Sequence, residues 1–184
     1  MSRALIPLAD GFEDIEAVSV IDVLRRGGVE VVTASLGDSL EVRSAHGIMM
    51  RAEVPLMAVL DDLFDAVVLP GGGEGTENLK RDPRVAEILR RHQGAKRLVA
   101  AICAAPVILT ELGIVPENVP MVCYPTCIVD LGRPCANAPV VADENFITGQ
   151  APGSALLFAL VVLQYLEGEA MARKVSRGLV TDVL

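Results

Sequence analysis

Cys103 stands in the segment Leu98-Val-Ala-Ala-Ile-Cys-Ala-Ala-Pro106, an apolar run that passes directly into helical sequence. This pattern predicts a β-strand that turns sharply into a helix at the cysteine. The first turn of a helix offers unpaired backbone N–H groups and a partial positive charge, which favour a thiolate over a thiol. Pro106 suits that turn, because proline lacks the N–H that would be unpaired there. The sequence therefore predicts a reactive thiolate, and the alternative is an inert cysteine packed at a strand end.

Glu16 is the first candidate partner of this thiol. It lies in a helix expected from about Glu13 to Arg26, on the same face as Val20, Val23 and Leu24. A carboxylate on an apolar face is costly to bury in its charged form, so we expect the pKa of Glu16 to be raised. A protonated Glu16 can donate a hydrogen bond to a thiolate and then move a proton. The alternative is a solvated acid at the helix start, which fits Glu13 and Asp14 better.

A run of glycines, Gly71 to Gly73, follows an expected strand. Glycine lets the backbone approach a ligand closely, so the N–H groups of Gly72 and Ala104 can together bind an oxyanion. Nucleotide binding is disfavoured, since Thr76 stands where the dinucleotide pattern requires a third glycine and Gly-Lys-Ser/Thr is absent. A tight turn with only a structural role is the remaining alternative.

Alternating strands and helices must bring these groups together. Strands are expected at 4–9, 29–35, 65–69, 97–102 and around Val140 and Phe146, with a hairpin or edge strands within 40–53. Helices are expected at 13–26, from the glycine run to about 94, and at 104–112, 153–167 and 169–177. The alternation predicts an α/β fold, a doubly wound sheet of mainly parallel strands with helices on both faces. Binding sites in such sheets lie beyond the carboxyl ends of the strands, where all three candidate groups fall.

Composition supports this fold and restricts the partners. The chain is 52% hydrophobic but only 3% aromatic, which suits buried parallel strands covered by helices. No repeat or linker divides residues 1–184, so a single domain is expected. Apolar runs such as 155–162 are too short for a membrane span of about 20 residues, and the net charge of −8 disfavours nucleic acid. We expect a cytoplasmic protein whose four cysteines are thiols.

Five segments together resemble the ThiJ/PfpI superfamily, in particular the branch of the parkinsonism-linked protein deglycase and its bacterial ThiJ-type relatives. They are Gly11-Phe-Glu-Asp-Ile-Glu-Ala17, Asp22-Val-Leu-Arg-Arg-Gly27, Val67-Val-Leu-Pro-Gly-Gly72, Ala100-Ala-Ile-Cys-Ala-Ala-Pro106 and Pro152-Gly-Ser154. The resemblance covers nearly the whole chain and implies a flavodoxin-like fold and a homodimer. It also implies that Cys103 is an oxidation-prone nucleophile, that Glu16 hydrogen-bonds to it, and that Gly72 and Ala104 supply the oxyanion donors.

The chain departs from the superfamily in its histidines. Tyr124 stands where the deglycase branch can carry a histidine near the cysteine, and Ala104 stands where the peptidase branch has one. Only His46 and His92 occur in the chain. We expect His92 to be solvated at a charged helix end. His46 lies in a predicted turn, from which a dimer interface is its one route to the site, and we do not expect it to act there. Peptidase activity through a cysteine–histidine pair is therefore not expected, and Tyr124 becomes the side chain expected to orient a substrate carbonyl.

Members of the superfamily are reported as glyoxalases, deglycases of glycated protein or nucleotide, redox-regulated chaperones and peptidases. The resemblance implies either an enzyme acting on a small reactive carbonyl or glycated substrate, or a non-enzymatic redox sensor or chaperone. In the first, Cys103 adds to an aldehyde and Glu16 moves the proton. In the second, Cys103 oxidises to a sulfinic acid held by Glu16 and the same amides. No residue pattern supports a thiazole phosphate site of thiamine metabolism.

Three further cysteines, Cys123, Cys127 and Cys135, lie close together in the sequence. Structural zinc sites prefer cysteine pairs two to four residues apart with a second pair, so no metal is expected, and no cofactor. A second hypothesis is that Cys123 or Cys127 forms a disulfide with a sulfenic acid on Cys103. The third reading is that all three are ordinary packed thiols.

Overall fold

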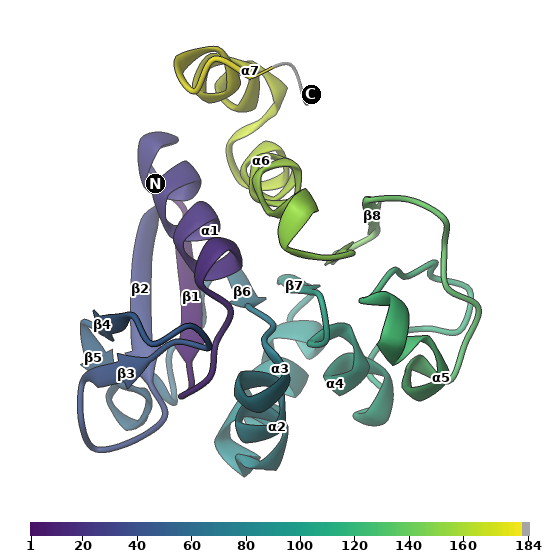
Figure 1. The fold of residues 1–184 in the computed structure, drawn as a ribbon. Coiled ribbons are helices and arrows are strands. Elements are labelled where there is room, and N and C mark those ends of the chain that lie inside the picture. Colours follow the sequence, from purple (N-terminus) through teal and green to yellow (C-terminus); the bar gives the residue numbers. More distant parts are fainter. Residues whose placement is uncertain (182–184) are drawn as a thin grey trace.

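The structure is a computed structural model that describes residues 1–181 (Figure 1). Within that range, one sheet of seven strands has the order β5-β2-β1-β6-β7-β9-β8. Its strands are β1 (Arg3–Leu8), β2 (Glu30–Ser35), β5 (Val54–Pro55), β6 (Ala66–Leu69), β7 (Leu98–Ile102), β8 (Val140–Asp143) and β9 (Phe146–Gly149). A separate hairpin pairs β3 (Glu41–Arg43) with β4 (Met49–Arg51). The helices are α1 (Asp14–Arg26), α2 (Gly73–Arg81), α3 (Pro83–Gly94), α4 (Pro106–Glu111), α5 (Ile128–Leu131), α6 (Ala155–Glu167) and α7 (Glu169–Gly178).

The strand directions confirm the predicted α/β fold. Strands β5, β2, β1, β6, β7 and β9 pair in parallel, and only β8, at one edge of the described sheet, runs antiparallel to its neighbour β9. Helices connect most of the parallel strands, as right-handed crossovers require. The antiparallel β3–β4 pair confirms the hairpin expected within residues 40–53.

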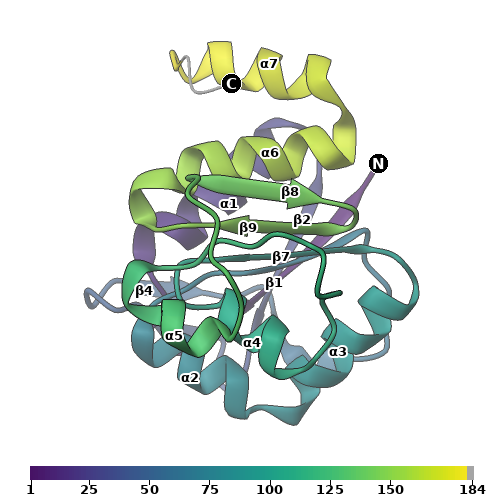
Figure 2. The ribbon, with the colours of Figure 1, turned by 90° about the vertical axis from the view of Figure 1, so that its right-hand side faces the viewer.

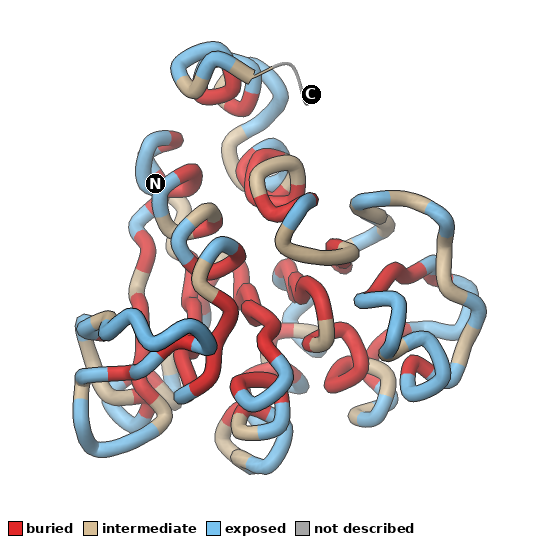
Figure 3. Tube along the Cα trace, in the orientation of Figure 1, coloured by how far each residue is buried: buried red, intermediate tan, exposed pale blue. Residues whose placement is uncertain are grey.

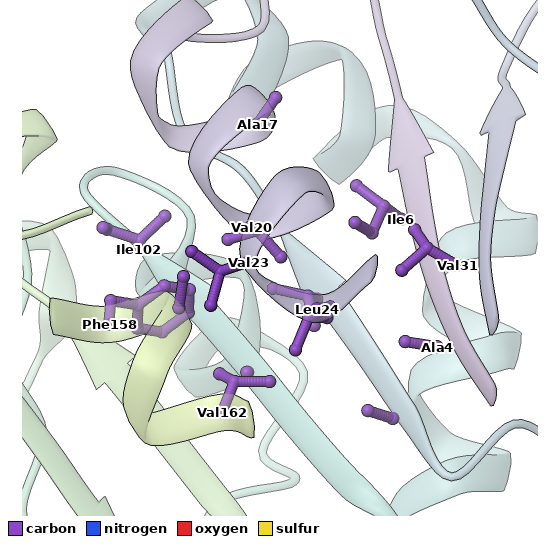
Figure 4. Packing of buried hydrophobic residues seen from close by; sticks show 14 of the residues in the cluster. Ala4, Ile6, Ala17, Val20, Val23, Leu24, Val31, Ile102, Phe158 and Val162 are labelled. Carbon is purple, nitrogen blue, oxygen red and sulfur yellow. The ribbon is translucent and has the colours of Figure 1, made fainter. Parts of the chain in front are cut away.

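Two apolar layers hold the helices against the sheet. On one face, Leu24 of α1 and Phe158 of α6 belong to one apolar cluster with Ile6 of β1 and Ile102 of β7, and Phe158 lies on the Ile102 side of this cluster (Figure 4). On the other face, Leu79 of α2 packs in a cluster with Leu5, the neighbour of Ile6 along the same strand. The alternation follows from the strand geometry, in which successive side chains point to opposite faces. Figures 1 and 2 show the resulting three layers, with α1, α6 and α7 on one side and α2, α3 and α4 on the other.

The central strands are buried along their whole length, whereas the hairpin loop and the outer helix faces are exposed (Figure 3). Every residue of β6 and β7 is buried, which explains why both strands are continuous apolar runs rather than alternating ones. Among the described residues, no helix combines the length and the apolar character that a membrane crossing would need.

Two helix boundaries differ from the predicted ones. The helical stretch after the glycine run is two helices, because Asp82 is extended (φ −85°, ψ 112°) and caps α3, whose first residue is Pro83. Proline favours an extended residue before it and suits the first position of a helix. Helix α4 begins at Pro106 rather than at Ala104, because the preceding residues form tighter turns, in which Ala105 N–H donates to Ile102 O and Val107 N–H donates to Ala104 O.

Candidate active site

Three loops meet at the carboxyl edge of the sheet because the strands that precede them are neighbours. Strand β6 pairs with β1 on one side and with β7 on the other. The residues that follow these strands are the loop 9–13, the glycines after Pro70, and Cys103. The strand order also reverses direction between β1 and β6, the position where open α/β sheets form their ligand sites.

Cys103 occupies a strained elbow between β7 and α4. Its φ of +66° lies in the left-handed region, which residues with a side chain seldom adopt. Two backbone hydrogen bonds hold it there: its N–H donates to Gly149 O at 3.0 Å, and its carbonyl accepts from Tyr124 N at 2.7 Å. The residue is only 8% exposed. The elbow predicted from the sequence is therefore confirmed, although the helix begins later than expected.

Glu16 is completely buried, as the apolar face of α1 predicted. Its Oε2 accepts a hydrogen bond of 2.7 Å from the N–H of Gly71, and its own N–H donates to Glu13 Oε2, the capping side chain of α1. The other oxygen, Oε1, has no partner of good geometry among the described residues, but the carboxyl lies within hydrogen-bonding reach of the Cys103 thiol. Burial raises the pKa of Glu16 to about 7, so the predicted direction is confirmed.

The N–H groups of Gly72 and Ala104 both approach the sulfur of Cys103, and each favours the thiolate. Burial and the negative charge of an ionised Glu16 act in the opposite direction and raise the pKa of Cys103 to about 12. The prediction of a lowered pKa is therefore wrong, because the two amides are outweighed. Because the negative charge of Glu16 is one cause of the rise, the value of about 12 describes the thiol beside a carboxyl that has already lost its proton.

Glycines let the three loops approach so closely. A Cβ on Gly71 would lie 2.6 Å from the Cβ of Cys103 and 2.7 Å from Glu16 Oε2. Gly72 has φ +90°, and a Cβ there would lie 2.2 Å from the carbonyl oxygen of Gly11. Sequence reasoning missed the role of Gly71 as a donor to Glu16. The glycine run signalled a close approach but not which residue it approaches.

The structure places Tyr124 beside the elbow through its backbone, whose N–H bonds to Cys103. The residue is 38% exposed, and the expected contact of its side chain with a substrate carbonyl stays a prediction. The prediction for His92 is wrong. It is fully buried, with its Nδ1 bonded to Ile88 O at 2.7 Å and its Nε2 accepting the N–H of Phe64 at 3.0 Å. This imidazole thus holds the backbone at Phe64, two residues before β6 begins.

His46 lies in the hairpin loop and joins a small polar cluster with Glu13 and Asp14, whose ligand atoms lie within 4.8 Å of one another. Asp14 accepts hydrogen bonds from the Ser44 hydroxyl and from the His46 ring, the latter at 2.8 Å. Glu13 accepts from Glu16 N at 2.8 Å. These contacts fasten the hairpin to the start of α1 and account for the cluster, and we assign no metal to it.

Comparison with known proteins gives the family of the chain. The family model described as DJ-1/PfpI family matches residues 2–165. The chain belongs to this family. Protein DJ-1 homolog B of Arabidopsis thaliana is 37% identical over 181 residues, which are 97% of this chain but 41% of that protein. The chain thus spans less than half the length of that relative.

Two further members of the family bear on chemistry and fold. Glutathione-independent glyoxalase DJR-1.2 of Caenorhabditis elegans is 36% identical over 168 residues, covering 89% of this chain and 87% of that protein. The solved structure of oxidized Toxoplasma gondii DJ-1 superposes with a TM-score of 0.95 at 32% identity, covering 99% of this chain and 100% of the other. The DJ-1 fold of the chain follows from this similarity.

Proposed function

We propose that the protein is a cysteine-dependent enzyme that converts small reactive carbonyls, of the methylglyoxal type, without glutathione. The observation that carries the proposal is the convergence on one sulfur of a buried carboxyl, Glu16, and two backbone donors, Gly72 and Ala104. The glyoxalase name of the Caenorhabditis elegans relative supports the same substrate class. Early adducts of these aldehydes with amines carry a related electrophilic carbon and form the wider substrate class.

The chemistry uses the pair of Cys103 and Glu16 in its singly protonated state. When the shared proton lies on Glu16, Cys103 is a thiolate that receives hydrogen bonds from the carboxyl and the two amides. The thiolate adds to the aldehyde carbon, forming a C–S bond and an oxyanion. The N–H groups of Gly72 and Ala104 then donate to that oxygen, which is stabilised because these donors are already in place.

Glu16 completes the reaction by moving protons. It donates its proton to the oxyanion and then, as a carboxylate, carries the proton of the former aldehyde carbon to the neighbouring ketone carbon, while the hydroxyl proton of the adduct passes to the ketone oxygen. One carbon is oxidised as the other is reduced, so no external oxidant or reductant is consumed. The product is a thioester of lactate on Cys103, which water hydrolyses to release lactate and the free thiol. With a pKa of about 7, Glu16 can both donate and accept a proton near neutral pH.

Lactate formation from methylglyoxal in the absence of glutathione tests the proposal. We expect turnover by the wild-type chain, none above buffer by Cys103→Ala, and a loss of about 10²-fold or more in Glu16→Gln, as is usual for a positioned acid–base group. Cys127→Ala serves as the matched control, because Cys127 is a half-buried cysteine on a different element. Equal rates for Cys103→Ala and wild type would disprove the proposal.

A second candidate function is that of a redox sensor. The similar Toxoplasma gondii DJ-1 structure is of an oxidized protein, which supports this candidate. Here Cys103 takes up two oxygen atoms to become a sulfinic acid, and a protonated Glu16 donates to it from the oxygen that otherwise has no partner. Mass spectrometry of peroxide-treated protein, together with the carbonyl assay, distinguishes the redox sensor from the enzyme. Sulfinic Cys103 in a protein without carbonyl turnover supports the sensor, and turnover without stable oxidation supports the enzyme.

We also propose that the chain forms a homodimer through α1 and the hairpin. Ile15 and Val18 on α1 and Ile48 and Met49 at the hairpin are each at least half exposed, although all four are large and apolar. The hairpin is bonded to the start of α1 through Asp14, and exposed large apolar side chains on two joined elements are typical of protein contacts. The cytoplasmic location expected from the sequence stays a prediction, in keeping with four cysteines that are all free thiols in the structure.

A further inference from the structure

The three cysteines outside the candidate active site gather in the segment that follows α4. Cys123 is buried, and Cys127 and Cys135 are half-buried. All three pack on the apolar layer that includes Leu131 and Met121. A short helical segment that includes α5 lies between Cys123 and Cys135 in the sequence, so the fold is needed to bring the two residues together.

The backbone places Cys123 and Cys135 on one face. Met121 and Cys135 form a parallel bridge, in which the N–H of Ala136 donates to Met121 O at 2.8 Å. Bridged residues point their side chains to the same side, and a residue two positions further along an extended chain does so as well. Cys123 is two positions beyond Met121. The side chains of Cys123 and Cys135 therefore lie on the same side of this bridge, and both pack on the same apolar layer. In the reduced protein the Cys123 thiol donates to Tyr124 O at 3.5 Å.

The contacts of Cys103 are different. Its sulfur faces the Glu16 carboxyl and the amides of Gly72 and Ala104, and its link to this segment is the backbone bond from Tyr124. A disulfide between Cys103 and Cys123 or Cys127 stays a hypothesis. The bridge between Met121 and Cys135, however, places the side chain of Cys135 on the same side as that of Cys123.

We propose that Cys123 and Cys135 form a second redox site, a reversible disulfide made by peroxide and independent of the function proposed for Cys103. Burial raises the pKa of Cys123 to about 12, so it stays a thiol at neutral pH, and the half-buried Cys135 is the sulfur that peroxide reaches. Cys135 attacks one peroxide oxygen, forming an S–O bond, breaking the O–O bond and releasing water. Cys123 then attacks the sulfenic sulfur and gives its proton to the departing hydroxyl, so that an S–S bond forms, the S–O bond breaks and a second water leaves. Two thiols are oxidised and one peroxide is reduced.

The disulfide would fasten the segment that carries Tyr124 to the loop around Cys135. Because the N–H of Tyr124 holds the Cys103 carbonyl, the cross-link steadies one wall of the candidate active site. It also closes a short loop of chain, which lowers the entropy of the unfolded state. Oxidised protein should therefore unfold at a higher temperature than reduced protein.

The experiment uses the Cys103→Ala chain, which removes the thiol of the candidate active site and keeps Cys123, Cys127 and Cys135. This protein is treated with hydrogen peroxide, alkylated and analysed by non-reducing peptide mass spectrometry. We expect a peptide that joins Cys123 to Cys135, lighter by two hydrogens, and restored to two thiols by dithiothreitol. Cys127→Ser should keep this peptide, whereas Cys135→Ser should lose it together with the rise in Tm on oxidation. The reduced Tm of each variant reports whether it folds.

Three results would overturn the proposal. One is a folded Cys103→Ala protein in which all three thiols remain alkylatable after peroxide. Another is a peptide joining Cys123 to Cys127 in place of Cys135. The third is a peptide joining Cys123 to Cys103 as the main product in the wild-type chain, which would make Cys123 the partner of the active-site sulfur instead.

Discussion

The N–H of Gly71 donates a hydrogen bond of 2.7 Å to Oε2 of Glu16, and this contact fixes the carboxyl beside the Cys103 thiol. Gly71 follows β6, Glu16 lies in the first turn of α1, and Cys103 follows β7. One backbone amide thus connects a loop and a helix that are more than fifty residues apart in the chain. The site depends on the absence of a side chain at Gly71 as much as on the presence of one at Glu16.

Gly71→Ala should therefore disrupt the site. The new Cβ would lie within 3 Å of Cys103 Cβ, Glu16 Oε2 and Ile102 O, and overpacking of this kind costs about 1–3 kcal/mol. We expect a lower free energy of unfolding in urea and a changed rate of Cys103 alkylation. Gly73→Ala is the matched control, because a Cβ there meets no atom within 4 Å among the described residues. Equal effects of the two substitutions would contradict the role given to Gly71.

The buried His92 should matter for stability and not for chemistry. His92→Ala leaves the N–H of Phe64 without its acceptor, and an unsatisfied buried donor costs about 1–3 kcal/mol. Burial lowers the pKa of His92 below its ordinary 6.5, so its stabilising contribution is present above pH 6.5 and is lost as the pH falls. Urea unfolding of wild type and variant at pH 5 and pH 8 measures both effects.

His46→Ala is the control for this prediction, because its side chain is 73% exposed and bonds only to the start of α1. We expect it to unfold nearly as wild type does. A larger loss of stability in His46→Ala than in His92→Ala would mean that the buried imidazole does not support the turn at Phe64.

The fold could be predicted from the sequence because its signals are local and agree with one another. Apolar runs without alternation marked β6 and β7 as strands buried on both faces, and Gly27 marked the end of α1. The break between α2 and α3 was missed although Asp82-Pro83 marks it. That pair is a helix start signal, and it lay within a stretch read as one helix.

The site was predictable in its members but not in its electrostatics. The positions of Glu16, Gly72 and Ala104 around Cys103 follow from strand order. The pKa of Cys103 does not, since it depends on how deeply the sulfur is buried and on the charge beside it. His92 was misplaced because its neighbours Arg90 and Arg91 suggested a solvated face, whereas the helix turns by about 100° per residue and carries the third side chain inward.

The proposed dimer predicts a specific change of oligomeric state. Val18→Glu places a charge on the apolar surface of α1, where Val18 is 50% exposed, so burial against a second copy would become unfavourable. Light scattering after size exclusion should give a mass of 39.0 kDa for wild type, twice the chain mass of 19.5 kDa, and of one chain for the variant. Val129→Glu, at a position that is 88% exposed on α5, should leave the dimer intact. A monomeric wild type would end the proposal.

The raised pKa of Glu16 predicts how the free energy of unfolding of wild type and of Glu16→Gln depends on pH. The pKa of Glu16 is raised from 4.5 to about 7, so the folded state binds a proton more tightly than the unfolded chain. Its contribution to stability is then complete below pH 4.5 and is lost as the pH rises through 7. At about 1.4 kcal/mol per tenfold change in proton affinity, wild type should lose roughly 3 kcal/mol relative to Glu16→Gln over this interval. The exposed Glu117→Gln should follow wild type throughout.

The rate of Cys103 alkylation, measured as a function of pH, tests the same pairing of Glu16 with Cys103. In wild type the singly protonated pair forms as the pH rises through about 7, so the rate should rise there and then level off until the second proton leaves near 12. Glu16→Gln has no shared proton, and its rate should follow one ordinary titration of the thiol with no step near 7. If both proteins show the step, the group that titrates near 7 is not Glu16. Another group must then supply the proton that the proposed chemistry needs.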